Sequence, residues 1–125
     1  IDVIATGHSP TNLTDKHKEF DNAVYGISSM ETTFALCYTH LVATGVISAE
    51  KLVEMMSKKP SEILRLYNKG CIAEGKDADL IVVDTKECYR IDPEHFASKA
   101  KFSPFAEQEV RGKVLYTMVS GKMLT

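Results

Sequence analysis

The apolar and polar positions at the start of the chain predict a short buried strand followed by a loop. Residues 3–5 are Val, Ile and Ala, an apolar run of the kind carried by a parallel strand that is covered on both faces. A loop rich in glycine, serine and proline follows at once and carries His8. Open α/β sheets and barrels place their chemistry at the carboxyl ends of strands, so this loop is a candidate site. Gly7 lies where such a site usually has a functional side chain.

The next part of the chain predicts a long loop and then a helix. Residues 11–30 are mostly polar and are expected to form a loop with one helical turn. Over residues 30–43 the apolar side chains recur on one helical face. Ser29 is the predicted N-cap of this helix, and Gly45 is expected to end it.

A second helical pattern follows. Residues 49–58 carry apolar side chains at helical spacing, and Ser48 is the predicted N-cap. Pro60 is expected to stop this helix and to open a third one that runs to Tyr67.

From Gly70 onward the pattern becomes that of strands and turns. The apolar run at residues 80–83 is the clearest strand, and Ser120-Gly121 is a typical hairpin turn. Residues 92–96 predict a helical turn. The full set of expected strands is 71–72, 80–83, 87–91, 110–119 and 122–124.

Composition and charge narrow the class of protein. The chain has 125 residues, 44% of them hydrophobic, which suits one soluble domain and is too short for a complete (β/α)₈ barrel of about 250 residues. A net charge of -2 with dispersed basic residues predicts no nucleic-acid or membrane partner. Three widely spaced cysteines predict a reducing cytoplasm. Because the chain starts at Ile1, we expect it to be the C-terminal part of a longer protein.

Individual polar residues give only a weak functional signal by spacing alone. His8 lacks a partner histidine at metal-ligand spacing, so it is expected to satisfy local backbone groups. Asp77, Asp79 and Asp84 flank a predicted strand at turn positions, where aspartate usually accepts hydrogen bonds from backbone amides. The residue pattern therefore indicates an α/β chain with one candidate loop.

Several sequence blocks resemble the C-terminal third of dihydroorotases, in the cyclic amidohydrolase superfamily. Residues 4–10, IATGHSP, resemble the family's last barrel strand and loop, usually IATDHAPH. Residues 70–84 match the superfamily pattern GxIxxGxxADLVVxD, which is shared by many amidohydrolases. Narrower similarity to dihydroorotase and its allantoinase and hydantoinase relatives comes from further blocks, at residues 24–32, 59–63, 98–105 and 112–114.

The resemblance implies a fold, a reaction and a cofactor. The expected fold class is α/β, as a C-terminal fragment of a (β/α)₈ metal-dependent hydrolase barrel with strands of its small β-sandwich. Residues 1–69 would supply the last barrel strand, the active-site loop and the C-terminal helices, and residues 70–125 the sandwich portion. The implied reaction is the reversible hydrolysis of dihydroorotate to carbamoyl aspartate in pyrimidine biosynthesis. The implied cofactor is zinc, held in the family by an H-x-H pair, a carboxylated lysine and further histidines upstream of this stretch.

This sequence departs from the family at two site positions. Gly7 stands where the family has the aspartate that binds metal and shuttles a proton, and Thr11 stands where it has a histidine that grips the substrate carboxylate. His8 aligns with a variable family position. We therefore expect no catalytic residue and no metal ligand in this chain. The expected substrate-binding residues are Thr11, Tyr25 and Gly26, the last two through their backbone groups.

Three functions remain open on this basis. The first is a dihydroorotase-like amidohydrolase of the cytoplasm, of which this fragment alone is inactive and binds no zinc. The second is a non-catalytic dihydroorotase-like scaffold for aspartate carbamoyltransferase, and the third an allantoinase- or hydantoinase-type enzyme. Dihydroorotate is the expected small-molecule partner, and a second copy of the chain or aspartate carbamoyltransferase the expected protein partner. An unpaired strand edge near residues 1–28 predicts self-association or partial disorder there.

Overall fold

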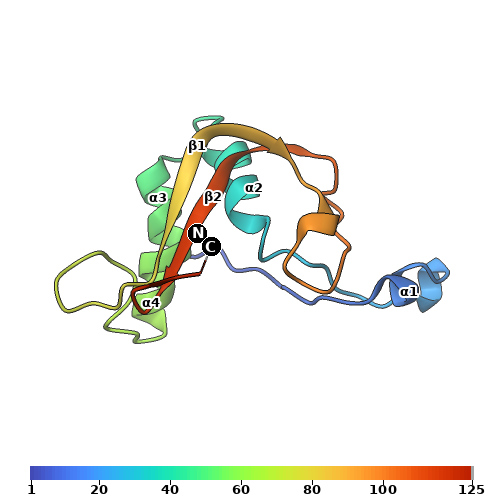
Figure 1. Cartoon of the computed structure of the whole chain (residues 1–125), viewed down its shortest axis with the longest axis horizontal. Helices are drawn as coiled ribbons and strands as arrows, with labels where there is room; N and C mark the ends of the chain where they lie inside the picture. Colours follow the sequence, from blue (N-terminus) through green and yellow to red (C-terminus); the bar gives the residue numbers. More distant parts are fainter. Residues whose placement is uncertain (125) are drawn as a thin grey trace.

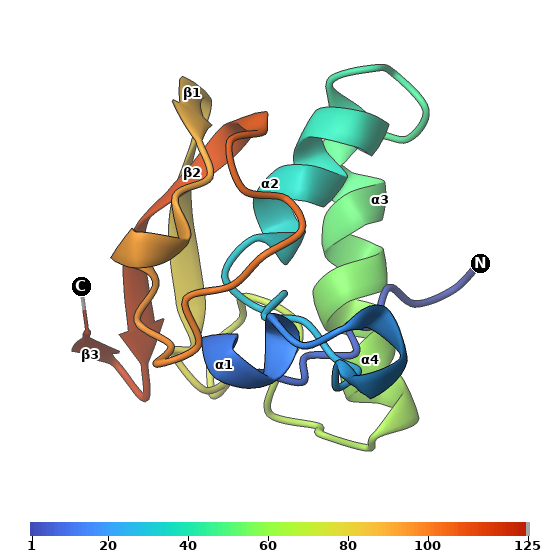
Figure 2. The same ribbon diagram turned by 90° about the vertical axis from the view of Figure 1, so that its right-hand side faces the viewer.

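A computed structural model describes residues 1–124, and it has a layer of helices against a long antiparallel ribbon (Figures 1 and 2). The ribbon is made of β1 (Leu80–Arg90) and β2 (Glu109–Val119), extended at one end by β3 (Lys122–Met123) in the order β1-β2-β3. The helices of residues 33–63 form the other layer, and α1 (Leu13–Lys16) projects away from both layers in Figure 1. This arrangement is a small α/β unit.

The predicted strand at residues 3–5 is wrong. Within residues 1–124, this segment pairs with no strand, and its backbone contact is to a helix, from Ile4 N to the Met55 carbonyl oxygen at 3.1 Å. The first strand-like contact comes later, as a single parallel bridge between His8 and Ile27. An apolar run forms a strand only where another strand offers a ladder of backbone partners, and the neighbour here is helical.

The helix expected over residues 30–43 forms later than predicted. It consists of α2 (Thr33–Cys37), continued by a π-helical segment, η2 (Tyr38–Val42). Ser29 contributes its carbonyl oxygen, which accepts from the amides of Thr32 and Thr33 at 3.1 and 3.0 Å, so it precedes the helix instead of capping it with its side chain. Residues 30–32 form a turn. Gly45, with a φ of 77°, lies beyond the last helical turn, as predicted.

The second helix runs straight through Pro60, contrary to prediction. It comprises α3 (Ala49–Val53), the π-helical η3 (Glu54–Lys58) and α4 (Lys59–Ile63), and Ser48 Oγ caps it by accepting from Lys51 N at 3.2 Å. In η3 the Lys59 amide donates to the Glu54 carbonyl, one residue further back than in an α-helix. At the same spacing the Met55 carbonyl would need an N–H from Pro60, which proline lacks.

Ile4 supplies the donor that Pro60 cannot, because its amide bonds the Met55 carbonyl oxygen. The proline is therefore accommodated inside the helix, and it leaves an acceptor that anchors the start of the chain. The predicted third helix to Tyr67 is also wrong, since α4 ends at Ile63 and Arg65 takes a φ of 56°.

One strand of the ribbon, β1, contains two strands that the sequence pattern predicted as separate. The predicted strands at 80–83 and 87–91 are both parts of β1, and the pairing shifts register between Asp84 and Cys88. Asp84 Oδ1 accepts from the amides of Lys86 and Glu87 at 2.7 and 3.1 Å, which satisfies the backbone of the extra residues.

The rest of the β region follows the prediction except at its start. The hairpin of β2 and β3 is confirmed, with Ser120 and Gly121 at φ values of 50° and 76°. The 3₁₀ turn η4 (Pro93–His95) confirms the expected helical turn. The predicted strand at 71–72 is absent: Cys71 lies in a bend and Ile72 in irregular structure. Earlier in the chain, the loop before α2 holds α1 and a second short turn, η1 (Phe20–Asn22).

The buried core lies between α2 and the two long strands. Ala35, Ile91 and Val110 are almost fully buried together, with Tyr89 and Phe96 among the side chains packed around them. Gly112 has a φ of 88°, and a Cβ atom there would approach the rings of Phe34 and Tyr38 to 3.2 Å, so the helix packs directly on the strand backbone.

Many large apolar side chains remain exposed outside this core. Ile72 and Phe20 are 91% and 95% exposed, and Ile63 and Tyr67 at the end of the helical layer are also exposed. Among the helices of residues 1–124, none has the length and hydropathy needed to cross a membrane.

Candidate functional site

The candidate loop lies against the segment that precedes α2. His8 forms a parallel bridge with Ile27, and Ser9 N donates to the Ile27 carbonyl oxygen at 3.0 Å. Gly7 and Thr11 lie close to His8 along the first segment, and Tyr25 and Gly26 lie just before Ile27 on the second. The contact between the two segments is called the crossing. The four residues named from sequence as site positions thus lie on two neighbouring segments. A single parallel bridge joins these segments.

Gly7 is a glycine that its backbone does not require. Its φ is not positive, and a Cβ atom added there would meet nothing within 4 Å. The position therefore has room for a side chain without strain.

His8 binds backbone groups, as predicted, but these groups lie 21 and 22 residues away along the chain and are not local ones. Its Nδ1 accepts from the amides of Ser29 and Met30 at 3.1 and 3.2 Å. The imidazole therefore joins the end of the first segment to the turn that starts α2.

Two hydroxyl groups beside this crossing are buried without a hydrogen-bond partner within residues 1–124. They are Thr11 Oγ1 and Ser29 Oγ. Buried hydroxyls are normally paired, so each of these atoms retains a donor and an acceptor for a further group. Thr11 is one of the predicted substrate-binding residues.

Tyr25 and Gly26 present backbone more than side chain to the site. The Tyr25 side chain is 97% exposed. Gly26 has a φ of 108°, and a Cβ atom there would lie 2.5 Å from the Ser9 carbonyl oxygen, so only glycine fits. Within residues 1–124, the amides and carbonyls of Tyr25 and Gly26 form no hydrogen bond.

The long loop between the two segments is held by charge and capping. Asn12 caps α1 by accepting from Asp15 N at 2.8 Å, and Lys16 Nζ donates to the Val24 carbonyl at 2.8 Å. Lys18, which bonds Asp15 at 2.7 Å, and then Asn12 hold the pKa of the Asp15 carboxyl below its usual value. Lys16 also lies 5.4 Å from the centre of the Phe102 ring, which links this loop to the loop before β2.

Glu31 ties the turn before α2 to the loop at residues 96–101. Its two carboxylate oxygens accept from Ala97 N at 2.8 Å and Ser98 N at 3.0 Å, and Ser28 Oγ donates to the Ala100 carbonyl at 3.3 Å. By its position in the sequence, Glu31 is only a favourable charge near a helix N-terminus. Its partners lie 66 and 67 residues away, so no local pattern marks this role.

Asp79 and Asp84 accept from backbone amides, as predicted, whereas the Asp77 carboxylate contacts Lys69. Asp79 accepts from Ser120 N at 2.7 Å and pairs with Lys69, which also contacts Asp77 at 2.9 Å. The hydrogen bond to Lys69 and then the Ser120 amide keep the pKa of the Asp79 carboxyl below its usual value. The amides of Lys86 and Glu87 do the same for the pKa of Asp84.

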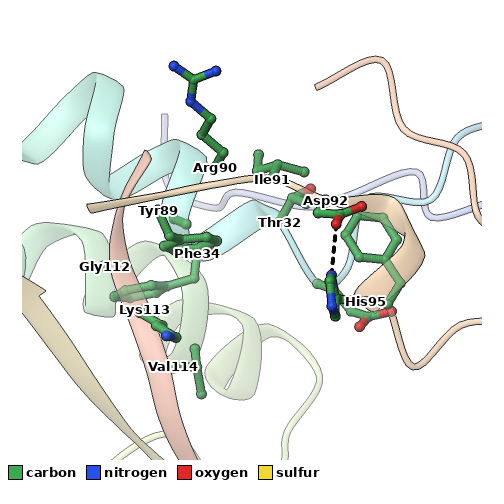
Figure 3. A pocket seen from close by; sticks show the side chains of 13 residues that line it. Thr32, Phe34, Tyr89, Arg90, Ile91, Asp92, His95, Gly112, Lys113 and Val114 are labelled. Atoms are coloured by element: carbon green, nitrogen blue, oxygen red, sulfur yellow. Dashed lines mark hydrogen bonds and ion pairs between the residues drawn. The ribbon is translucent and has the colours of Figure 1, made fainter. Parts of the chain in front are cut away.

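A cavity of about 390 Å³ lies elsewhere, between α2 and the ribbon (Figure 3). Phe34, Tyr89 and Gly112 line it, and Asp92 Oδ2 meets His95 Nδ1 at 2.8 Å at one end. Asp92 also accepts from Glu94 N at 3.0 Å, which lowers the pKa of its carboxyl. Gly7, His8 and Thr11 do not line this cavity, so it is separate from the candidate loop.

Residues 1–124 do not form a complete zinc site by themselves. Within residues 1–124, no group of three or more His, Cys, Asp or Glu side chains is placed to hold a metal ion. Gly7 offers no donor atom, and His8 Nδ1 already accepts two amides.

Comparison with known proteins identifies the class. The profile of the amidohydrolase family matches residues 7–124, and the chain belongs to this family. Curated relatives narrow the match to dihydroorotases. The chain is 44% identical over 124 residues to dihydroorotase from Desulforapulum autotrophicum and 43% identical over 124 residues to that of Pediococcus pentosaceus.

These matches cover 99% of this chain but only 28% and 29% of the relatives, so the chain spans just over a quarter of their length. Solved structures agree with the fold. L-hydantoinase (dihydropyrimidinase) from Arthrobacter aurescens matches with a TM-score of 0.93 and 33% identity, over 100% of this chain and 29% of its own. D-hydantoinase (dihydropyrimidinase) from Thermus sp. matches with a TM-score of 0.89 and 29% identity, over 98% of this chain and 28% of its own. The chain is thus an α/β unit that corresponds to part of these larger enzymes.

Proposed function

We propose that the protein carrying this chain is a dihydroorotase-like cyclic amidohydrolase, which opens the ring amide of dihydroorotate to give carbamoyl aspartate and can close it again. The observation that carries this proposal is the match to dihydroorotases at up to 44% identity along essentially the whole chain. Such a protein would serve pyrimidine biosynthesis in the cytoplasm. The division into residues 1–69 from the barrel and 70–125 from the β-sandwich stays part of the proposal, and Thr125 lies outside the described residues.

In this proposal the chain contributes substrate contacts and no catalytic group. The backbone groups of Tyr25 and Gly26 form no hydrogen bond within residues 1–124, which leaves them able to bind a cyclic amide. The buried Thr11 hydroxyl also has an unused donor and acceptor. Because no group of three or more potential ligands comes together within residues 1–124, a zinc ion would need ligands from outside these residues. The isolated fragment is therefore expected to be inactive.

The test is an assay of the whole protein, loaded with zinc, against a panel of cyclic amides. Hydrolysis of dihydroorotate in preference to hydantoin, dihydrouracil and allantoin supports the proposal. Hydrolysis of hydantoin or dihydrouracil with no action on dihydroorotate would replace it by the hydantoinase-type alternative. That alternative has its own support in the 33% identity and TM-score of 0.93 to the Arthrobacter aurescens enzyme.

A second candidate function is a non-catalytic scaffold for aspartate carbamoyltransferase. Gly7 and Thr11 favour it, because both positions lack the side chains that the family uses on metal and substrate. Loss of a positioned acid or base lowers a rate by about 10²–10⁴-fold. Inactivity of the zinc-loaded protein, together with co-elution with aspartate carbamoyltransferase in size-exclusion chromatography, is the expected result for a scaffold. Turnover of dihydroorotate at an ordinary enzymatic rate excludes it.

A further inference from the structure

The segment with the predicted substrate contacts is fixed from two sides by residues that have no assigned role. On one side, His8 Nδ1 accepts from Ser29 N and Met30 N, at 3.1 and 3.2 Å. On the other, the Glu31 carboxylate accepts from the amides of Ala97 and Ser98. Residues 26–31 are thereby held between the end of the first segment and a loop from the ribbon layer.

The His8 contact sets the form of the imidazole. A ring nitrogen that accepts from an amide must carry a lone pair, and two backbone N–H groups point to the same Nδ1. Backbone amides can only donate, so a proton on Nδ1 would face two other donors. The arrangement therefore requires the tautomer with its proton on Nε2.

The held segment lies directly beside the predicted substrate contacts. Gly26 packs so closely on Ser9 that a Cβ atom would lie 2.5 Å from the Ser9 carbonyl oxygen, and Ser9 N bonds the Ile27 carbonyl. A shift of Ser29 and Met30 away from His8 would move Ile27 and Gly26 with them. Because backbone contacts to a ligand depend on where the backbone lies, small shifts there weaken binding.

We propose that His8 is a positioning residue, whose Nδ1 fixes residues 26–30 so that the backbone groups of Tyr25 and Gly26 face a bound cyclic amide. This inference rests on the proposed function for the identity of the ligand. Its structural part, the hold of His8 on Ser29 and Met30, does not depend on that function.

The test compares three substitutions of His8 in the whole protein. In His8→Asn, the amide oxygen is bonded to Cγ, as Nδ1 is in histidine, so it can accept from the same two amides. In His8→Gln the oxygen lies one bond further out, near the place of Nε2, and in His8→Ala there is no acceptor. His40 is an exposed residue of η2 outside the candidate site, and His40→Asn, His40→Gln and His40→Ala are the matched controls.

Binding of dihydroorotate, measured by calorimetry, is expected to stay within about twofold of wild type in His8→Asn and to weaken by about tenfold in His8→Gln and His8→Ala, the loss that one or two neutral hydrogen bonds produce. Hydrogen exchange at the Ser29 and Met30 amides should accelerate in the same two variants and not in His8→Asn. The His40 variants should change neither measurement.

A readout on wild type removes any dependence on how the variants fold. With ¹⁵N-labelled histidine, the His8 ring, assigned by its disappearance in His8→Asn, should show a non-protonated Nδ1 and a protonated Nε2. A protonated Nδ1 overturns the proposal, and so does unchanged exchange of Ser29 and Met30 in folded His8→Gln. If wild type binds no cyclic amide, the proposed function fails and the ligand part of this inference fails with it, whereas the exchange and ring spectra still decide whether His8 holds the segment.

Discussion

The candidate site and the ribbon core are stabilised in different ways. Around His8, the contacts are hydrogen bonds from backbone amides, and the Tyr25 side chain beside them is 97% exposed. Between α2 and the ribbon, Ile91 and Val110 are each only 1% exposed, and apolar contact holds the layers together. The first region is defined by where its backbone runs, and the second by which side chains fill it.

This difference means that the site region depends little on the side chains at positions 7 and 11 for its shape. The two segments meet through backbone groups, so their contact does not depend on which side chains stand at positions 7 and 11. The chemistry of such a site is more vulnerable, since the backbone cannot supply a carboxylate ligand or a general acid or base.

The largest expected effect is a gain of activity. Gly7→Asp with Thr11→His, in the whole zinc-loaded protein, should raise dihydroorotate turnover by about 10²–10⁴-fold, the contribution of a positioned acid or base. The structure has room for the new aspartate, since a Cβ at position 7 meets nothing within 4 Å. Steady-state assays measure the gain, and Gly7→Asn with Thr11→His is the control without a carboxylate. An equal gain in both double variants would contradict the role given to position 7.

In the core, Ile91→Ala should lower the free energy of unfolding by about 2–5 kcal/mol, because it empties a fully packed site. Ile91 is 1% exposed. Ile72→Ala is the matched control: its side chain is 91% exposed, so a change within about 0.5 kcal/mol is expected. Urea denaturation gives both values. A small loss for Ile91→Ala would mean that the ribbon core is not what stabilises the layers.

Two glycines of the site should respond differently to the same substitution. Gly26→Ala should destabilise by about 1–3 kcal/mol, through a positive φ and a clash with the Ser9 backbone. Gly7→Ala should change stability by less than about 1 kcal/mol, and can be stabilising, because its backbone suits alanine. Thermal unfolding compares the pair. Equal effects of the two substitutions would contradict the close packing of Gly26 on the Ser9 backbone.

The smallest expected effect is a change in how stability depends on acidic pH, through Asp84 in β1. The amides of Lys86 and Glu87 hold the pKa of Asp84 below its usual value of 3.8, so the ionised form stabilises the folded state. That contribution is fully present above the usual value and is lost as the pH falls through the lowered pKa. Asp84→Asn should therefore make the unfolding midpoint in urea less dependent on pH in this acidic range. The exposed Glu74→Gln is the control, and a parallel pH profile in wild type and Asp84→Asn would contradict the prediction.

The sequence alone determined the features that depend on local pattern. The Ser120-Gly121 turn between two strand patterns predicted the hairpin, and Ser48 predicted the start of the second helix, since caps and turns are set by residues a few positions apart. Motifs along the chain also gave the amidohydrolase family, which the profile match over residues 7–124 supports.

The tertiary structure decided what depends on distant neighbours. Residues 3–5 form no strand because a helix lies beside them, and Pro60 stays inside a helix because Ile4, far away in sequence, bonds the carbonyl that proline leaves unpaired. The same holds at the site: His8 reaches Ser29 across 21 residues and Glu31 reaches Ala97 across 66. Backbone hydrogen-bonding groups must be satisfied, but a local pattern does not say by which partner, so only the folded chain shows how this site is held.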